Sequence, residues 1–305
     1  IIAFVACLRA GVIAIPVYPP DPTNPAKGMH AFRNICEDSG ATLALTTSKY
    51  DLARRVGAGV AGAKAAFSVA ATFFGVGGGA VESGVNPPTP STWPEGLKWF
   101  ATNTTQMQNT PSSSSPSLPP THHNPTQVAF LQYTSGSTGN PKGVMVTIGN
   151  LSHNVAVFAS ALQLNHNTRW VTWLPQYHDM GLIGTLLGPM CTGGSVTCLS
   201  PITFIRDPNI WLRLASETRA DMLVVPTFAL PLAARKAFGK SSVITAPKLD
   251  LSCVRHILVG AEPVTPAAVD IFAQFSQFGL RSNIIIPAYG LAEHTLYVCN
   301  NGSLR

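Results

Sequence analysis

The segment 133–143 carries the clearest chemical pattern in the sequence. It contains three glycines, four Ser or Thr hydroxyls and Lys142, and it lies between two apolar runs of strand length. Glycine lets backbone N–H groups approach an anion, hydroxyls add donors, and lysine neutralises charge. The pattern predicts a loop that binds a polyphosphate. It is not a Walker A loop, because that motif needs a different spacing and a following helix, whereas a strand-like run follows here.

Three further segments place polar side chains directly after apolar runs. His178 lies in the segment 173–184, Glu262 in 259–264 and Glu293 in 286–298. A carboxylate such as that of Glu293 offers the hard oxygen that Mg²⁺ prefers. His, Glu and similar residues are common on protein surfaces. The position of these three directly after predicted strands is what makes them candidates for ligand binding or catalysis.

Apolar runs that alternate with stretches of helical spacing predict the elements that must position these residues. Such alternation is typical of βαβ units and a mostly parallel sheet, in which ligands bind beyond the carboxyl ends of the strands. The predicted fold class is therefore α/β. The predicted strands cover 128–133, 142–147, 169–175, 194–201, 220–226, 254–260 and 283–290, and the predicted helices cover 150–162, 206–217, 228–238 and 265–278.

The part of the chain before this pattern predicts fewer elements. The opening residues 1–18 predict a helix, a turn and a strand, and 31–39 and 40–47 predict a further helix and strand. A run rich in Gly, Ala and Val then leads to a Ser- and Pro-rich tract at 111–125, which is typical of a linker. The formal G-x-G-x-x-G pattern at 57–62 follows no buried strand, so we do not assign it a dinucleotide.

These segments together resemble the adenylate-forming (AMP-binding) superfamily. Segment 133–143 resembles its phosphate-binding signature, and 259–264 and 286–298 resemble its adenine-side loop and its Tyr-Gly-x-x-Glu element. The residues of the segments 173–184, 286–298 and 7–22 are similar to those of the fatty acyl-AMP ligase branch of the superfamily. The resemblance covers roughly 1–50 and 95–298 and implies the large N-terminal domain of that superfamily. It divides the chain into an N-terminal part (1–50), an insertion with a linker (51–127) and an ATP- and acyl-binding core (128–305).

The resemblance also implies roles for individual residues. Lys142, His178 and Glu293 are the implied catalytic residues, and Thr138 and Glu293 lie at the implied Mg²⁺ site. The implied ATP-binding residues are Thr134, Ser135, Gly136, Ser137, Thr138, Gly139, Lys142, Gly260, Ala261, Glu262, Pro263, Tyr289, Gly290, Leu291, Ala292 and Glu293. The implied acyl-binding residues are His178, Met180, Gly181, Leu182 and Phe228, with Ile183 and Met190 as further candidates for the wall of an acyl tunnel.

The implied reaction is the ATP- and Mg²⁺-dependent activation of a fatty acid to acyl-AMP with release of pyrophosphate. The acyl group then passes to the phosphopantetheine thiol of an acyl carrier protein. Two alternatives stay open: an acyl-CoA synthetase, and a degenerate module without catalysis. Ile148 and Val259 support the second alternative, because they stand where the family commonly has histidine and asparagine. Relative to the family, we expect the first residues and the small C-terminal domain to be absent, and we expect the chain alone to be poorly active.

Composition excludes several other classes of protein. The chain of 305 residues is 46% hydrophobic and only 11% charged, with a net charge of +6, which is not typical of a disordered or nucleic-acid-binding protein. Its six scattered cysteines lack metal-ligand spacing and predict free thiols in a reducing compartment. No integral membrane segment is expected, and the predicted location is the cytoplasm.

Overall fold

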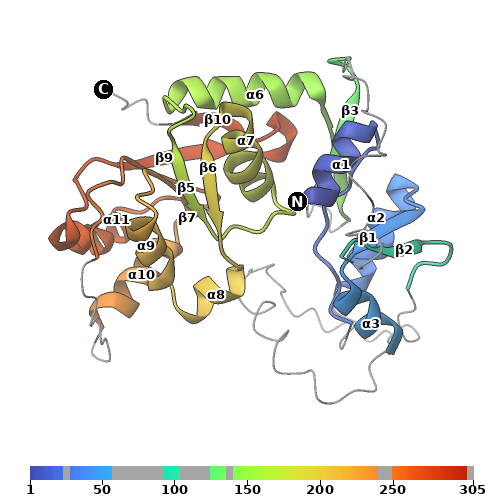
Figure 1. Ribbon diagram of the computed structural model, residues 1–305, viewed down its shortest axis with the longest axis horizontal. Helices are drawn as coiled ribbons and strands as arrows, with labels where there is room; N and C mark the ends of the chain where they lie inside the picture. Colours follow the sequence, from blue (N-terminus) through green and yellow to red (C-terminus); the bar gives the residue numbers. More distant parts are fainter. Residues whose placement is uncertain (23–27, 57–92, 104–123, 135–139, 240–248, 301–305) are drawn as a thin grey trace, which may run out of the picture. The chain divides into compact units, whose positions relative to one another are not determined.

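The computed structural model describes residues 1–22, 28–56, 93–103, 124–134, 140–239 and 249–300 (Figure 1). The chain divides into two compact units. Unit 1 comprises Ile1–Asn124 and Val128–Met145, and unit 2 comprises Pro125–Gln127 and Val146–Arg305.

Unit 1 is built from short elements. Helices α1 (Ile2–Ala10), α2 (Met29–Ser39) and α3 (Ser48–Val56) accompany strands β1 (Leu43–Thr46) and β2 (Lys98–Ala101), which pair in parallel. Strands β3 (Val128–Thr134) and β4 (Lys142–Thr147) form a second two-stranded sheet, and β4 runs on into unit 2. The predicted strand near the start of the chain is reduced to one bridge, between Ala14 and Phe130.

A cluster of half-buried aromatic side chains joins α3 to β2 in unit 1. The Trp93 and Trp99 rings meet edge to face at 5.3 Å, and Tyr50 stacks on Trp99 at 6.2 Å. The Arg54 guanidinium lies 4.5 Å from the centre of the Trp99 ring, which adds a cation–π contact. These contacts hold α3 on β2.

Unit 2 contains a six-stranded sheet in the order β10-β9-β8-β7-β5-β6. The neighbouring pairs from β6 to β9 are parallel, and β10 pairs with β9 in antiparallel fashion. The strands are β5 (Arg169–Thr172), β6 (Ser195–Cys198), β7 (Met222–Pro226), β8 (His256–Gly260), β9 (Ile285–Gly290) and β10 (Tyr297–Asn300).

Two groups of helices accompany this sheet. Helix α6 (Ile148–Ala161) packs with the π-helix η2 (Met180–Leu187) and with α7 (Gly188–Thr192), whereas α9 (Asn209–Glu217) and α10 (Ala229–Phe238) pack on the sheet (Figure 1). The remaining helical segments are α8 (Pro201–Arg206), α11 (Pro266–Phe272), η3 (Ala273–Phe278) and η4 (Ala292–His294). The core includes Trp173, Phe204, Trp211 and Phe272, all with no exposed surface.

The α/β class and the mostly parallel sheet predicted from the sequence are confirmed. The predicted helix 206–217 corresponds to α9, which begins only at Asn209 because Asp207 and Pro208 separate it from the preceding helix α8. The sequence pattern missed β10 and the π-helix η2. Residues 240–248 and most of the predicted insertion and linker, including the 57–62 pattern, lie outside the described residues, so the predicted division into 1–50, 51–127 and 128–305 stays a prediction.

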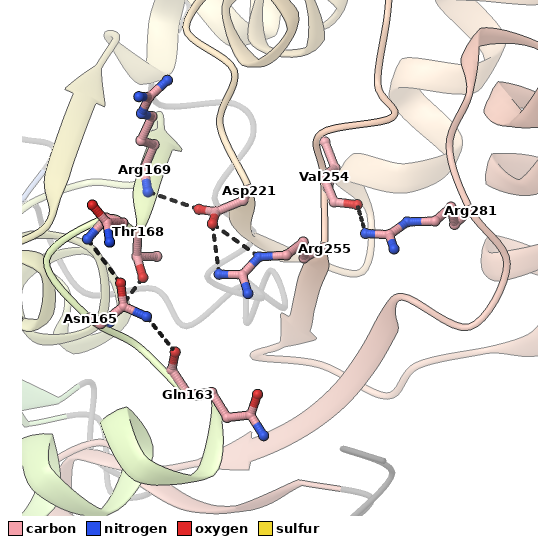
Figure 2. Close-up of polar contacts among 9 residues, drawn as sticks. Gln163, Asn165, Thr168, Arg169, Asp221, Val254, Arg255 and Arg281 are labelled. Atoms are coloured by element: carbon pink, nitrogen blue, oxygen red, sulfur yellow. Dashed lines mark hydrogen bonds and ion pairs between the residues drawn. The ribbon is translucent and has the colours of Figure 1, made fainter.

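The amino ends of three strands of unit 2 are tied together by Asp221 (Figure 2). Its carboxylate accepts hydrogen bonds from the backbone N–H of Arg169 at 2.8 Å and from the Arg255 guanidinium at 2.7 and 3.0 Å. Its carbonyl accepts the N–H groups of Arg255 and His256. Asp221 therefore joins β5, β7 and β8 at the end opposite the candidate site.

No helix within the described ranges is both long and apolar enough to cross a membrane.

Candidate functional site

Segments that follow four parallel strands of unit 2 carry the predicted site residues of that unit. His178 follows β5, Phe228 follows β7, the segment 260–263 ends and follows β8, and the segment 289–293 ends and follows β9. Since the carboxyl ends of parallel strands lie at one edge of a sheet, these residues share that edge. The structure thus collects in one place four segments that are far apart in the sequence.

His178 forms an ion pair with its neighbour Asp179. The imidazole Nδ1 lies 2.6 Å from the Asp179 Oδ1, and the His178 side chain is 59% exposed while Asp179 is buried. The hydrogen bond to the Asp179 carboxylate raises the pKa of His178 above its ordinary value. Asp179 also accepts the Met180 N–H at 2.6 Å, which caps η2. The pair therefore presents an exposed imidazole whose charged form is stabilised.

Gly181 allows η2 to lie against the loop that carries His178. A Cβ atom at Gly181 would lie 2.1 Å from the Pro175 carbonyl oxygen, so no larger residue fits without movement of the helix. Leu182 and Ile183 are buried in the core, Met180 is half-buried, and Met190 is exposed. Their part in an acyl tunnel stays a prediction.

Glu262 connects the loops that follow β7 and β8. Its Oε1 accepts the Phe228 N–H at 2.7 Å, and its carbonyl accepts the Thr227 hydroxyl at 3.3 Å. The half-buried Phe228 ring in turn meets the Trp173 ring edge to face at 5.9 Å. The predicted acyl-binding Phe228 and the predicted ATP-binding Glu262 are thus direct neighbours.

Most of the predicted adenine-binding residues are exposed at the ends of β8 and β9. Tyr289 is 61% exposed at the end of β9, and Ala261, Glu262 and Pro263 are exposed after the buried Gly260. Ala261 adopts a φ of 66°, a left-handed conformation that is uncommon for a residue with a Cβ. An exposed ring is available for stacking on a base.

Glu293 lies on the turn that joins β9 to β10. The turn is closed by the hydrogen bond from the Leu291 N–H to the Leu296 carbonyl at 2.9 Å, and Gly290 lies so close to that carbonyl that an added Cβ would be 2.2 Å from it. The Glu293 side chain is exposed. Mg²⁺ in nucleotide enzymes is held by one or two carboxylates together with substrate phosphates and water, so this donor fits Mg²⁺.

The segment predicted to bind phosphate belongs to unit 1, and its ends are described. Thr134 ends β3, and exposed Lys142 begins β4. The Tyr133 hydroxyl donates to the Asp38 carboxylate of α2, and burial together with this carboxylate raises the pKa of Tyr133 to about 12. Ser135, Gly136, Ser137, Thr138 and Gly139 lie outside the described residues.

Asn154 is a site-related residue that the sequence analysis missed. It lies on α6 among buried Leu151, Val155 and Phe158, and its side chain binds the backbone of the segment that follows Glu293. An asparagine on the apolar stripe of a helix was the signal that could have identified it.

No clusters of three or more His, Cys, Asp or Glu that could hold a metal ion occur among the described residues. All six cysteines are free thiols. Of the two residues at the predicted metal site, Glu293 is described and Thr138 is not.

The whole chain, residues 1–305, matches the family described as AMP-binding enzyme. It is 34% identical over 310 aligned residues to a medium-chain-fatty-acid–[acyl-carrier-protein] ligase, TtuA, from Teredinibacter turnerae, an alignment that covers 98% of this chain and 46% of that protein. It is 43% identical over 175 residues to the long-chain-fatty-acid–AMP ligase FadD32 from Mycobacterium marinum, covering 56% of this chain and 27% of that protein.

The fold is similar to that of a fatty acyl-adenylate ligase from L. pneumophila, solved in complex with acyl adenylate and pyrophosphate. The TM-score is 0.75 at 30% identity, and the match covers 98% of this chain and 44% of that structure. The chain thus spans about half the length, or less, of the relatives that it matches.

Proposed function

The chain belongs to the AMP-binding enzyme family, and from this premise we propose that the protein uses ATP to activate a fatty acid as acyl-AMP. The observation that carries the proposal is the convergence of His178, Phe228, Glu262, Tyr289 and Glu293 at the carboxyl ends of β5, β7, β8 and β9. The names of the relatives support a fatty acid as the substrate, because they are fatty-acid–AMP and fatty-acid–carrier-protein ligases.

The proposed chemistry needs no nucleophile from the protein. A carboxylate oxygen of the fatty acid attacks the α-phosphorus of ATP, the bond from that phosphorus to the β-bridging oxygen breaks, and pyrophosphate leaves with the electron pair. Catalysis then depends on alignment of the two substrates and on stabilisation of negative charge.

Each predicted residue has a role in that alignment. Thr134, the segment 135–139 and Lys142 bind the β- and γ-phosphates of ATP. Tyr289 stacks on adenine, and the segment 260–263 forms the opposite wall. His178, with its stabilised positive charge, attracts the carboxylate of the fatty acid, and Phe228 and η2 contact its chain.

Glu293 and Thr138 are the residues that would hold Mg²⁺. When bound, this ion neutralises charge on the phosphates of ATP. The exposed carboxylate of Glu293, on a closed hairpin turn, supports this assignment.

The acyl group is proposed to pass to the phosphopantetheine thiol of an acyl carrier protein. The thiol sulfur attacks the acyl carbon of acyl-AMP, AMP leaves, and the thiol proton goes to solvent. The carrier protein named as acceptor for TtuA supports this choice over CoA. The free thiols fit a reducing compartment, and we place the reaction in the cytoplasm.

The test uses the protein together with the small C-terminal domain that the resemblance implies. It is incubated with ATP, Mg²⁺ and fatty acids of graded length, and the products are identified by mass spectrometry. Three parallel reactions contain no thiol, CoA or an acyl carrier protein. The proposal predicts acyl-AMP without thiol and acyl transfer to the carrier protein alone. Acyl-CoA would instead identify an acyl-CoA synthetase, and a folded protein that makes no acyl-AMP would favour the non-catalytic module that Ile148 and Val259 support.

A further inference from the structure

The side chain of Asn154 binds the backbone of the Glu293 turn at three points. Its Nδ2 donates to the Tyr297 carbonyl at 2.8 Å and to the His294 carbonyl at 3.3 Å, and its Oδ1 accepts the Tyr297 N–H at 2.9 Å. Asn154 is only 4% exposed. An amide that both donates to and accepts from one residue fixes that residue in position and orientation.

The turn that Asn154 holds is strained. Thr295 has φ 70° and ψ −59°, and the Leu296 N–H donates to the His294 carbonyl at 2.9 Å, which together define a γ-turn. A positive φ is unfavourable for a β-branched residue and persists only where neighbouring groups enforce it. The His294 carbonyl that closes this turn is also an acceptor for Asn154.

Packing alone does not explain an asparagine at this position. Leu151, Val155 and Phe158 share the buried face of α6, and the Phe158 ring already meets Tyr297 at 6.3 Å. Asparagine is a poor helix former, and its buried polar atoms would be unfavourable without partners. The three hydrogen bonds to the turn satisfy the polar atoms of the Asn154 side chain and so offset the cost of burying them.

We propose that Asn154 is a positioning residue that enforces the strained turn at Thr295 and thereby holds the Glu293 carboxylate in its metal-binding position. This inference rests on the proposed function, in which Glu293 binds Mg²⁺. Asn154 itself touches neither metal nor nucleotide. Its contribution is to keep the carboxylate from moving when the hairpin would otherwise relax.

The test compares Asn154→Ala with Val155→Ala, a truncation of the neighbouring buried residue on the same helix. The readout is the Mg²⁺ concentration that gives half-maximal ATP binding, measured by calorimetry on the purified protein, with thermal unfolding recorded in parallel. Loss of a residue that orients a metal ligand typically weakens metal affinity by about 10- to 100-fold. Asn154→Ala is therefore expected to raise the Mg²⁺ requirement at least about tenfold, and Val155→Ala is expected to leave it unchanged.

Glu293→Gln, alone and combined with Asn154→Ala, separates the inference from its premise. If Asn154 acts through Glu293, the double variant requires no more Mg²⁺ than Glu293→Gln alone. Additive effects, or equal effects of Asn154→Ala and Val155→Ala, would overturn the inference while leaving the proposed function intact. A Glu293→Gln variant with the wild-type Mg²⁺ requirement would instead contradict the metal role of Glu293 and, with it, the premise.

Asn154→Asp keeps the inference testable if Asn154→Ala does not fold. The carboxylate keeps the shape of the amide and the acceptor for the Tyr297 N–H, but it cannot donate to the His294 and Tyr297 carbonyls. A raised Mg²⁺ requirement in this variant supports the inference, and a wild-type requirement contradicts it.

Discussion

At the candidate site, the charge of one neighbouring residue changes the pKa of His178. The Asp179 carboxylate, 2.6 Å away, raises the pKa of His178, so the imidazole stays protonated to a higher pH than a free histidine. A group whose pKa is raised in the folded state stabilises the fold fully below its unfolded pKa of about 6.5. That contribution disappears as the pH rises through the folded pKa, and it is small because the imidazole is mostly exposed.

Asp179→Asn tests this pair. The amide oxygen can still cap η2, but the negative charge is lost, so we expect the pKa of His178 to fall toward about 6.5. The measurement is an NMR titration of the imidazole, assigned by comparison with His178→Gln. In the same variant, the KM for fatty acid should begin to rise at a lower pH than in the wild type. An unchanged pKa would show that Asp179 does not control His178.

At the scale of elements, η2 and the strand ends set the geometry of the site. The π-helix begins directly after the His178–Asp179 pair, and Gly181 brings it into contact with the Pro175 carbonyl. π-Helical turns are rare and occur frequently at functional sites. The position of His178 therefore depends on how closely η2 packs.

Gly181→Ala should disturb that packing more than Gly184→Ala on the same helix. The new Cβ would lie 2.1 Å from the Pro175 carbonyl oxygen at position 181, but 3.2 Å from the Leu296 Cδ2, the end of a side chain, at position 184. We expect Gly181→Ala to lower the free energy of unfolding by about 1–3 kcal/mol, as overpacking does. Urea denaturation measures this, and equal stability of the two variants would contradict the close contact.

Asp221 connects the amino ends of β5, β7 and β8, opposite the candidate site (Figure 2). Asp221→Asn retains the shape of the side chain but weakens its bonds to the Arg255 guanidinium and to the Arg169 N–H. The expected loss in the free energy of unfolding is about 1–3 kcal/mol. Exposed Glu217, changed to Gln, is the matched control and should stay within about 0.5 kcal/mol of the wild type. A similar effect of both changes would show that Asp221 contributes no more than a surface charge.

The sequence predicted those elements whose signal is local. Each parallel strand of unit 2 was visible as an apolar run. The signal is clearest for β7, in which Met222–Val225 are all buried, because a strand buried on both faces has no polar side. The π-helix was not, since an unbroken apolar run such as 180–187 has no period that separates a π-helix from an α-helix. Nor was the bond of Asn154 to Tyr297, which joins residues 143 positions apart. Such a contact depends on tertiary packing rather than on local pattern.

At the scale of the whole molecule, the proposed reaction draws on both units. Thr134 and Lys142, the ends of the segment predicted to bind phosphate, belong to unit 1, whereas His178, Tyr289 and Glu293 belong to unit 2. The similarity to TtuA covers 98% of the chain and so includes both units. Substitutions in either unit should therefore abolish the same chemical step.

The most direct test of this account is the exchange of labelled pyrophosphate into ATP by the purified protein, with and without fatty acid. Formation of acyl-AMP is reversible, so we expect exchange that requires both fatty acid and Mg²⁺. Lys142→Ala in unit 1 and Glu293→Gln in unit 2 should each reduce it by about 100-fold or more, the scale of losing one group that stabilises transition-state charge. Three results would contradict the proposed reaction: exchange without fatty acid, release of ADP instead of AMP, or no exchange by a folded protein that includes the C-terminal domain implied by the family.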